Sequence, residues 1–225
     1  SHGANQIRDI KYPIKLVYRH FIARYATKLM ACGEDAGKWM FCGAPFEILS
    51  NAIPAADYSF DGERKKIQRE KWGILPNELL VGHVGSFTIP KNHLFLLDVF
   101  HEIQKHTPAK LMIVGDGNLR PSIEEKIRKL GLEEKVILTG LRSDVPELLQ
   151  TMDVFVFPSL YEGLPVTLVE VQASGLPCLI SDKVPIECKM TDAVQQIPLT
   201  ESTEIWAERA IEAARLPREN TYEEI

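Results

Sequence analysis

The sequence has few cysteines, and their spacing is not that of metal ligands. The four are Cys32, Cys42, Cys178 and Cys188. There is no CxxC pair and no accompanying series of histidines, so the pattern favours free thiols over a zinc site or a disulfide framework. Free thiols are typical of a reducing compartment.

The sequence also lacks an excess of basic residues. It holds 26 Lys and Arg against 31 Asp and Glu, which gives a formal net charge of -5. Proteins that bind nucleic acid need Lys and Arg concentrated on one face. We therefore expect no nucleic-acid partner.

Long apolar runs are missing as well. No run of about 18 apolar residues is present, so no transmembrane helix is expected. The first residues, SHGANQIRDIKYP, show neither a signal-peptide pattern nor the character of a natural start. These observations predict a cytoplasmic fragment.

Several catalytic signatures are absent. The segment FPSLYEG is not a G-x-S-x-G nucleophile elbow. The segment GDGNLR, residues 115–120, has Arg120 where a dinucleotide fingerprint needs its third glycine, and it follows the second predicted strand. Four histidines lie near one predicted strand and helix: His83, His93, His101 and His106. Their spacing does not place them on one helical face, so we interpret them as surface or capping residues and predict no metal site.

The middle of the chain contains a regular alternation of strand and helix patterns. Short apolar runs that end in Gly, Pro or Ser occupy residues 79–85, 110–117, 135–140, 153–159 and 177–181. Helical patterns lie between them at 93–105, 121–130, 145–151 (with Asp144 as N-cap) and 165–174. The alternation predicts an α/β fold with a doubly wound parallel sheet, in which ligands bind at the carboxyl ends of the strands.

The first 75 residues have a different character. An amphipathic helix is predicted after Pro13, with a basic stripe of Lys11, Lys15 and Arg19 that is either solvated or in contact with anionic lipid or phosphate. A strand and turn are expected in 28–43, and a connecting helix in 56–73. We place a boundary near Trp72 to Pro76, which divides the chain into residues 1–75 and 76–225.

The stretch YEGLPVTLVE, residues 161–170, follows a predicted strand and begins a predicted helix. With Pro165 at the first helical position, nearby backbone N–H groups can bind a phosphate. These groups belong to Gly163, Leu164, Val166 and Thr167. Glu162 and Glu170 flank them, and carboxylates accept hydrogen bonds from sugar hydroxyls, so a ligand with a diphosphate between two sugars is predicted. The alternative is that both glutamates are solvated charges favoured by the helix dipole.

The stretch FPSLYEGLPVTLVEVQASGLPCLIS resembles the E-x7-E region of family 4 glycosyltransferases, especially those of bacterial exopolysaccharide and capsule synthesis. The resemblance covers about residues 1–218 and includes GHVGSFTIPKNHLFLLDVF (82–100), IVGDG (113–117) and VILTGLRSDVPELL (136–149) in the family order. It implies the Rossmann-like, donor-binding C-terminal half of a GT-B enzyme in residues 76–225. Residues 1–75 would be a remnant of the N-terminal domain with its connecting segment.

The resemblance also implies roles for single residues. The base of the nucleotide would lie against Gly140, Leu141 and Arg142, and the diphosphate against Lys91. Glu162 would lie beside the donor sugar, which makes Lys91 and Glu162 the catalytic candidates, and Glu170 would hold the ribose. The loop after Gly85 would also contact the phosphates, but Ser86 stands where the family usually has an arginine, so one phosphate contact is missing.

By this resemblance the chain binds a nucleotide-sugar, with UDP-sugar expected, and needs no metal or other cofactor. The reaction would be a retaining sugar transfer by front-face attack. The acceptor, a sugar or a lipid-linked glycan, would bind through the N-terminal domain that is mostly missing, so this chain alone is expected to be inactive. A non-catalytic nucleotide-sugar binding module and a nucleotide-sugar epimerase of the same fold remain the alternatives. The expected place of action is the cytoplasm, with contact at the inner face of the membrane left open.

Overall fold

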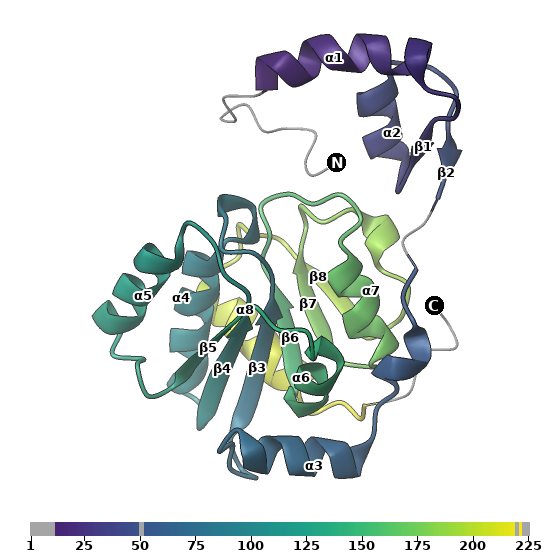
Figure 1. Cartoon of the computed structure of the whole chain (residues 1–225). Coiled ribbons are helices and arrows are strands. Elements are labelled where there is room, and N and C mark those ends of the chain that lie inside the picture. Colours follow the sequence, from purple (N-terminus) through teal and green to yellow (C-terminus); the bar gives the residue numbers. More distant parts are fainter. Residues whose placement is uncertain (1–11, 50–51, 219–220, 222–225) are drawn as a thin grey trace.

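The centre of the protein is a six-stranded, entirely parallel sheet (Figure 1). The computed structural model describes residues 12–49, 52–218 and 221. The strands are β3 (Leu79–Val84), β4 (Ala109–Val114), β5 (Val136–Gly140), β6 (Val154–Phe157), β7 (Cys178–Ser181) and β8 (Val194–Ile197). Their order is β5-β4-β3-β6-β7-β8, so the direction of winding reverses between β3 and β6. The predicted doubly wound α/β sheet is confirmed.

Helices cover both faces of this sheet. One face carries α3 (Gly62–Lys71), α6 (Val145–Thr151) and α7 (Val166–Ala173), while the other carries α4 (His93–Gln104), α5 (Arg120–Lys129) and α8 (Thr203–Ala213). Short 3-10 turns occupy Ala55–Tyr58 (η1), Ile89–Lys91 (η2) and Ile186–Cys188 (η3). Because both faces are covered, strands of this sheet must be apolar on both sides.

Strand β4 shows how the apolar runs are used. Leu111 and Ile113 are buried in the cluster under α4, α5 and α8, whereas Met112 and Val114 are buried in the cluster under α6 and α7. This alternation follows from the two-residue period of a strand. Fully burying one such side chain stabilises the fold by about 1.5–3 kcal/mol.

The N-terminal part forms a separate small unit (Figure 1). It contains α1 (Tyr12–Tyr25), β1 (Met30–Ala31), α2 (Glu34–Phe41) and β2 (Glu47–Ile48), and β1 pairs with β2 in parallel. The predicted helix near Pro13 and the strand after it are confirmed. The expected turn in 28–43 is wrong in part, because residues 34–41 continue as a helix.

The predicted basic stripe on α1 can be followed only at Arg19. Lys11 and the side chain of Lys15 lie outside the described residues. The Arg19 guanidinium donates to the Trp39 carbonyl oxygen at 3.2 Å and lies 5.3 Å from the Trp39 ring centroid. Arg19 therefore helps to join α1 to α2.

The connecting helix predicted over 56–73 is confirmed in part, because α3 covers only Gly62–Lys71 and the 3-10 turn η1 precedes it. Its N-cap is Asp61, whose carboxylate accepts hydrogen bonds from the backbone N–H groups of Glu63 at 2.8 Å and Arg64 at 3.2 Å. The helix packs on α6, and Arg69 reaches Asp153 at the start of β6. These contacts join α3 to α6 and to the start of β6, while the division of the chain at 75/76 stays a prediction.

Strand β8 and helix α8 follow the last predicted strand. The middle of β8 is Gln195 and Gln196, so its sequence lacks the continuous apolar run of the inner strands. As an edge strand it is buried only at its ends, Val194 and Ile197. Helix α8 buries Trp206 together with three alanines on one side, a periodic signal that the sequence does contain.

Candidate donor site at the carboxyl ends of the strands

The candidate site lies where the winding of the sheet reverses. Here the loop after β3 meets the loop after β6, and backbone groups join them. The Leu160 N–H donates to the Pro90 carbonyl oxygen at 2.8 Å, and the Asn92 side-chain amide donates to the Pro158 carbonyl oxygen at 3.1 Å. Two loops far apart in sequence thus form one surface at the position where such sheets bind ligands.

This surface brings together the two residues predicted to be catalytic. Lys91 Nζ donates to Glu162 Oε1 at 2.7 Å, across 71 residues of sequence. Their side chains are only 14% and 12% exposed, and the ammonium lies 4.5 Å from the Phe157 ring centroid. The family resemblance implies that they contact different parts of the ligand, whereas here they form an ion pair with each other. Their roles toward a ligand stay predictions.

Helix α7 begins beside this pair, and no side chain caps it. Its first residue is Val166, and Pro165 is the N-cap with φ -73° and ψ 122°. The prediction of Pro165 as the first helical residue is therefore wrong by one position, because its ψ is still extended. Gly163 is exposed, and Leu164 and Thr167 are partly buried. The start of the helix still offers N–H groups to an anion.

Glu170, one turn into α7, has a partner that the sequence did not suggest. The Tyr58 hydroxyl donates to Glu170 Oε1 at 2.7 Å, across 112 residues of sequence. Tyr58 belongs to η1, which lies beside α7. No local pattern in the sequence could have found this contact, because it depends on how the connecting segment packs.

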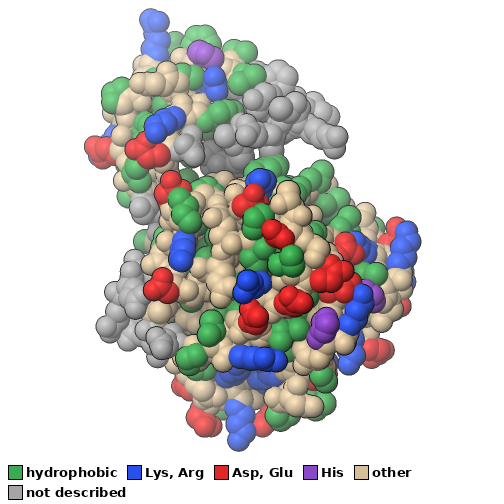
Figure 2. Space-filling model, turned by 180° about the vertical axis from the view of Figure 1, so that it is seen from behind, with side chains coloured by type: hydrophobic (Ala, Val, Ile, Leu, Met, Phe, Trp, Pro, Cys, Tyr) green, Lys and Arg blue, Asp and Glu red, His purple; other side chains and the backbone are tan. Residues whose placement is uncertain are grey.

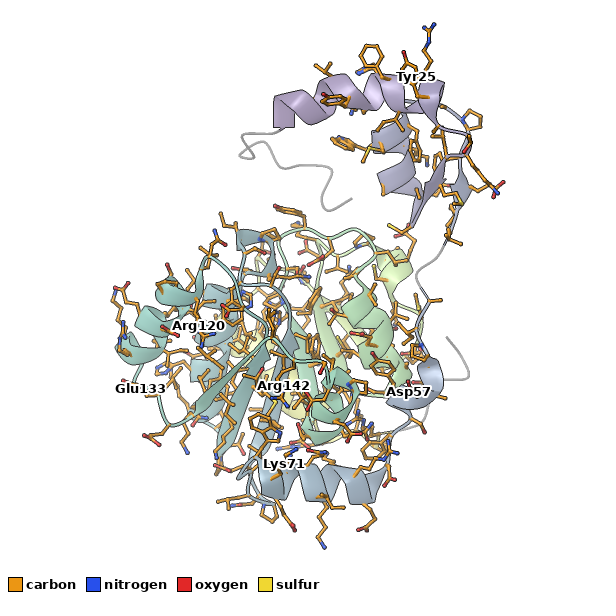
Figure 3. All side chains as sticks on the ribbon, viewed as in Figure 1. Tyr25, Asp57, Lys71, Arg120, Glu133 and Arg142 are labelled. Carbon is orange, nitrogen blue, oxygen red and sulfur yellow. The ribbon has the colours of Figure 1, made fainter. Side chains whose placement is uncertain are left out.

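The loop after β5 is the most exposed part of the predicted site. Gly140 has a positive φ of +71°, and the Leu141 side chain is 81% exposed. The Arg142 guanidinium makes two hydrogen bonds to Asp144, at 2.7 Å and 2.6 Å, and lies 5.8 Å from the Trp72 ring centroid (Figure 3). The Arg142 guanidinium lowers the pKa of the Asp144 carboxyl.

Asp144 does not act as predicted. It occupies the N-cap position of α6, but its side chain makes no capping hydrogen bond. The reason is that both carboxylate oxygens are taken by Arg142. This arrangement instead holds the Arg142 side chain in one position at the predicted base-binding loop.

The loops after β3 and β4 approach each other closely at Gly115. A Cβ atom there would collide with the Gly85 carbonyl oxygen, and the φ of +139° disfavours any other residue. Ser86, next to Gly85, is exposed, and its hydroxyl lies 3.3 Å from that of Thr88. The consequence of a serine at this position stays a prediction.

The interpretation of His83 and His93 as surface or capping residues is wrong. Their side chains are 0% and 2% exposed, and the two rings pack edge to face with centroids 4.8 Å apart. His83 Nδ1 lies 2.9 Å from the Val156 carbonyl oxygen. Burial lowers the pKa of His93 to about 4, with a smaller contribution from the nearby Lys91 ammonium. The two buried rings thus lie near Lys91, and both burial and the lysine charge disfavour their protonation.

Two further properties bear on the class of protein. Across the described residues, no three His, Cys, Asp or Glu side chains gather as a metal site would require. Among the described helices, none combines the length and apolar character of a membrane span. Figure 2 shows acidic and basic side chains intermixed on the side turned away in Figure 1.

Comparison with curated proteins finds relatives that are named as glycosyltransferases. The chain is 41% identical over 217 residues to EpsF of Bacillus subtilis (strain 168), which carries a glycosyltransferase name, covering 91% of this chain and 56% of that protein. It is 27% identical over 182 residues to the UDP-Gal:alpha-D-GlcNAc-diphosphoundecaprenol alpha-1,3-galactosyltransferase of Escherichia coli, covering 75% and 47%. The chain thus spans about half the length of the curated relatives it matches.

Solved structures share the fold. Anabaena HepE in complex with UDP-glucose superimposes with a TM-score of 0.76 at 20% identity, covering 89% of this chain and 57% of that one. WaaG, a glycosyltransferase involved in lipopolysaccharide biosynthesis, gives a TM-score of 0.74 at 24% identity, covering 94% and 62%. The family model for glycosyl transferases group 1 matches residues 64–214. This match covers more than half of the chain, and with the 41% identical relative it shows that the protein belongs to the group 1 glycosyl transferases.

Proposed function

We propose that this chain is the donor-binding half of a retaining glycosyltransferase that uses a UDP-sugar in exopolysaccharide or capsular polysaccharide synthesis. One observation carries the proposal. Lys91 and Glu162 meet beside the uncapped start of α7, at the point where the winding of the sheet reverses. A cation and free N–H groups there suit a diphosphate, and a carboxylate beside them suits a sugar hydroxyl.

In this proposal the nucleotide lies across the carboxyl ends of the strands. The loop Gly140–Arg142 receives the base, and β5 lies two strands from β3, roughly 10 Å at the usual strand spacing of about 4.8 Å. Glu170 accepts from the ribose hydroxyls. The diphosphate binds Lys91 and the N–H groups of Val166 and Thr167. Glu162 is then no longer paired with Lys91 and can accept from the donor sugar.

The transfer step then needs stabilisation of the leaving group. The bond between the anomeric carbon and the diphosphate oxygen breaks, and its electron pair stays on the diphosphate. The acceptor hydroxyl oxygen bonds to the anomeric carbon on the same face and passes its proton to the leaving oxygen. Lys91 and the start of α7 stabilise the negative charge that develops, so no metal is assigned to this step.

The acceptor is proposed to be a sugar or a lipid-linked glycan, bound by a part that the longer relatives have in addition. The Escherichia coli relative is named for a diphosphoundecaprenol-linked sugar. Correct placement of two reactants is worth about 7–11 kcal/mol of the barrier. We therefore propose that these 225 residues bind nucleotide but transfer no sugar.

Contact with the cytoplasmic face of a membrane is a further part of the proposal. Helix α1 exposes Val17, Tyr18, Phe21 and Tyr25, with Arg24 nearby. Aromatic and basic side chains on one helix suit an anionic lipid surface. Flotation with vesicles that contain anionic lipid tests this part, and a Phe21→Ser variant that floats equally well would contradict it.

Calorimetric titration with UDP, uridine and GDP tests the donor site. We expect the chain to bind UDP and Glu170→Gln to bind it more weakly, because a charge-assisted hydrogen bond is worth about 1.5–3 kcal/mol. Glu187→Gln, an exposed carboxylate on η3, is the matched control. Equal UDP affinity of the wild-type chain and Glu170→Gln would contradict the assignment of Glu170 to the ribose.

The same chain incubated with UDP-sugars and GDP-sugars separates the alternatives. Free nucleotide in excess of the control without protein would indicate hydrolysis or transfer, and would contradict the proposed inactivity of this chain. A changed sugar configuration would indicate an epimerase. Binding without either product is expected for this chain, and transfer on addition of the part that the longer relatives have would exclude a purely non-catalytic module.

A further inference from the structure

The contact between Tyr58 and Glu170 links the connecting segment to the donor site. The Tyr58 hydroxyl donates to Glu170 Oε1 at 2.7 Å, and the Tyr58 side chain is 6% exposed. Burial, together with the Glu170 carboxylate, raises the pKa of Tyr58. A tyrosine hydroxyl is protonated at neutral pH, so it can donate to Glu170.

The segment that carries Tyr58 is held from a second side by Gln150 of α6. The backbone N–H of Asp61 donates to Gln150 Oε1 at 3.0 Å, and Gln150 Nε2 donates to the Ser59 carbonyl oxygen at 3.2 Å. Gln150 is itself buried, at 1% exposure. The Gln150 amide thus helps to fix the position of Tyr58, whose ring is buried in the hydrophobic cluster under α6 and α7.

The C-terminal part of the chain holds the same segment from a third side. The Arg218 guanidinium lies 4.4 Å from the Phe60 ring centroid. It also donates to the Leu149 carbonyl oxygen at 2.9 Å and to the Ser174 carbonyl oxygen at 2.7 Å. Residues 58–61 are therefore placed relative to both α6 and α7.

We propose that Tyr58 is a positioning residue for nucleotide binding. It holds one oxygen of the Glu170 carboxylate, which leaves Oε2 to accept from the ribose hydroxyls. Within the described residues, no other hydrogen bond or ion pair engages this carboxylate. Without the Tyr58 hydroxyl the carboxylate can rotate, and binding must then restrict it again. The inference rests on the proposed function of Glu170.

The substitution Tyr58→Phe tests this role, because it keeps the ring and removes the hydroxyl. We expect UDP to bind about 3- to 10-fold more weakly, as for the loss of one hydrogen bond that orients a carboxylate. The affinity for 2′,3′-dideoxy-UDP should not change, since that ligand lacks the ribose hydroxyls. Tyr25→Phe, an exposed tyrosine on α1 at 77% exposure, is the matched control.

A double substitution separates positioning from folding. In the Glu170→Gln background, Tyr58→Phe should have a clearly smaller effect on UDP affinity than in the wild-type chain. Equal losses for UDP and 2′,3′-dideoxy-UDP would overturn the inference, because Tyr58 would then act on the fold in general. Unchanged UDP affinity in Tyr58→Phe would also overturn it. If the wild-type chain binds neither UDP nor a UDP-sugar, the proposed function itself fails, and this inference fails with it.

Discussion

Two partly buried ion pairs lie at opposite ends of the sheet and differ in their surroundings. Lys91 and Glu162 meet at the carboxyl ends of the strands, with side chains 14% and 12% exposed. Arg69 and Asp153 meet at the amino end of β6, with side chains 10% and 17% exposed. Burial alone would predict similar behaviour for the two pairs.

Their hydrogen bonding is very different. Arg69 donates to Asp153 and also to the carbonyl oxygens of Thr151, Leu75 and Glu78. Asp153 accepts further hydrogen bonds from Lys65 at 2.6 Å and from the Leu80 backbone N–H at 2.7 Å. In the described part of the chain, Lys91 Nζ makes one hydrogen bond, to Glu162.

This difference separates a structural ion pair from one suited to binding. Buried charges whose hydrogen bonds are all satisfied are costly to disturb. A lysine whose Nζ makes one hydrogen bond within the described residues has two more N–H donors to offer to a ligand. A phosphate can therefore replace Glu162 as the partner of Lys91, or bind Lys91 together with it.

The largest expected effect is on stability, from Arg69→Met. Removing this guanidinium leaves Lys65 as the remaining charged partner of Asp153 and takes the side-chain donor away from three carbonyl oxygens, so the free energy of unfolding should fall by about 3–5 kcal/mol. Lys91→Met should cost only about 1–2 kcal/mol, because Lys91 makes a single hydrogen bond in the described part of the chain. Urea unfolding of both variants measures the difference, and equal losses would remove the distinction between the pairs.

We expect low pH to destabilise the protein through His93, which follows η2 near the carboxyl end of β3. Burial keeps its pKa at about 4 in the folded protein, below the usual 6.5, so the unfolded chain takes up the proton first. Stability should therefore fall between pH 6.5 and pH 4, by about 3 kcal/mol at most from this residue. His93→Phe should reduce that loss. Urea unfolding at both pH values checks it, and the same pH dependence in the variant would exclude His93 as the cause.

Lys91→Ala should weaken UDP binding by about 1.5–3 kcal/mol, because a charge-assisted contact to the diphosphate is lost. Uridine, which has no phosphate, should bind the variant and the wild-type chain equally. Lys183→Ala, an exposed lysine paired with Asp182, is the control. Calorimetric titration decides between the outcomes, and an unchanged UDP affinity would place the diphosphate elsewhere.

The smallest expected effect is a gain, from Ser86→Arg. A guanidinium at the end of β3 can contact the phosphates, so UDP binding should tighten by about 1–2 kcal/mol. The gain should shrink at high salt and disappear for uridine. Ser122→Arg, on the exposed side of α5, controls for added charge. If Ser86→Arg has no effect while Lys91→Ala weakens UDP, the loop after Gly85 differs from that of the family.

Much of the fold could be predicted because its signals are local. The five predicted strands are apolar runs that end in a residue that breaks a strand, and the four inner ones, β3, β4, β6 and β7, are buried on both faces. Strand β8 was not predicted, since an edge strand with Gln195 and Gln196 has no such run. His83 and His93 were misplaced because their burial depends on the aromatic rings packed around them, and not on their spacing.

The sequence by itself determined the alternation of strands and helices and the position of Glu162 and Glu170 around the start of α7, because both follow from periodicity and spacing along ten or fewer residues. Only the tertiary structure decided that Lys91 meets Glu162 across 71 residues and that Tyr58 meets Glu170 across 112. The physical reason is that these contacts depend on the order of the strands and on where the connecting segment packs. Burial of the whole core sets both, and no short stretch of sequence encodes either one.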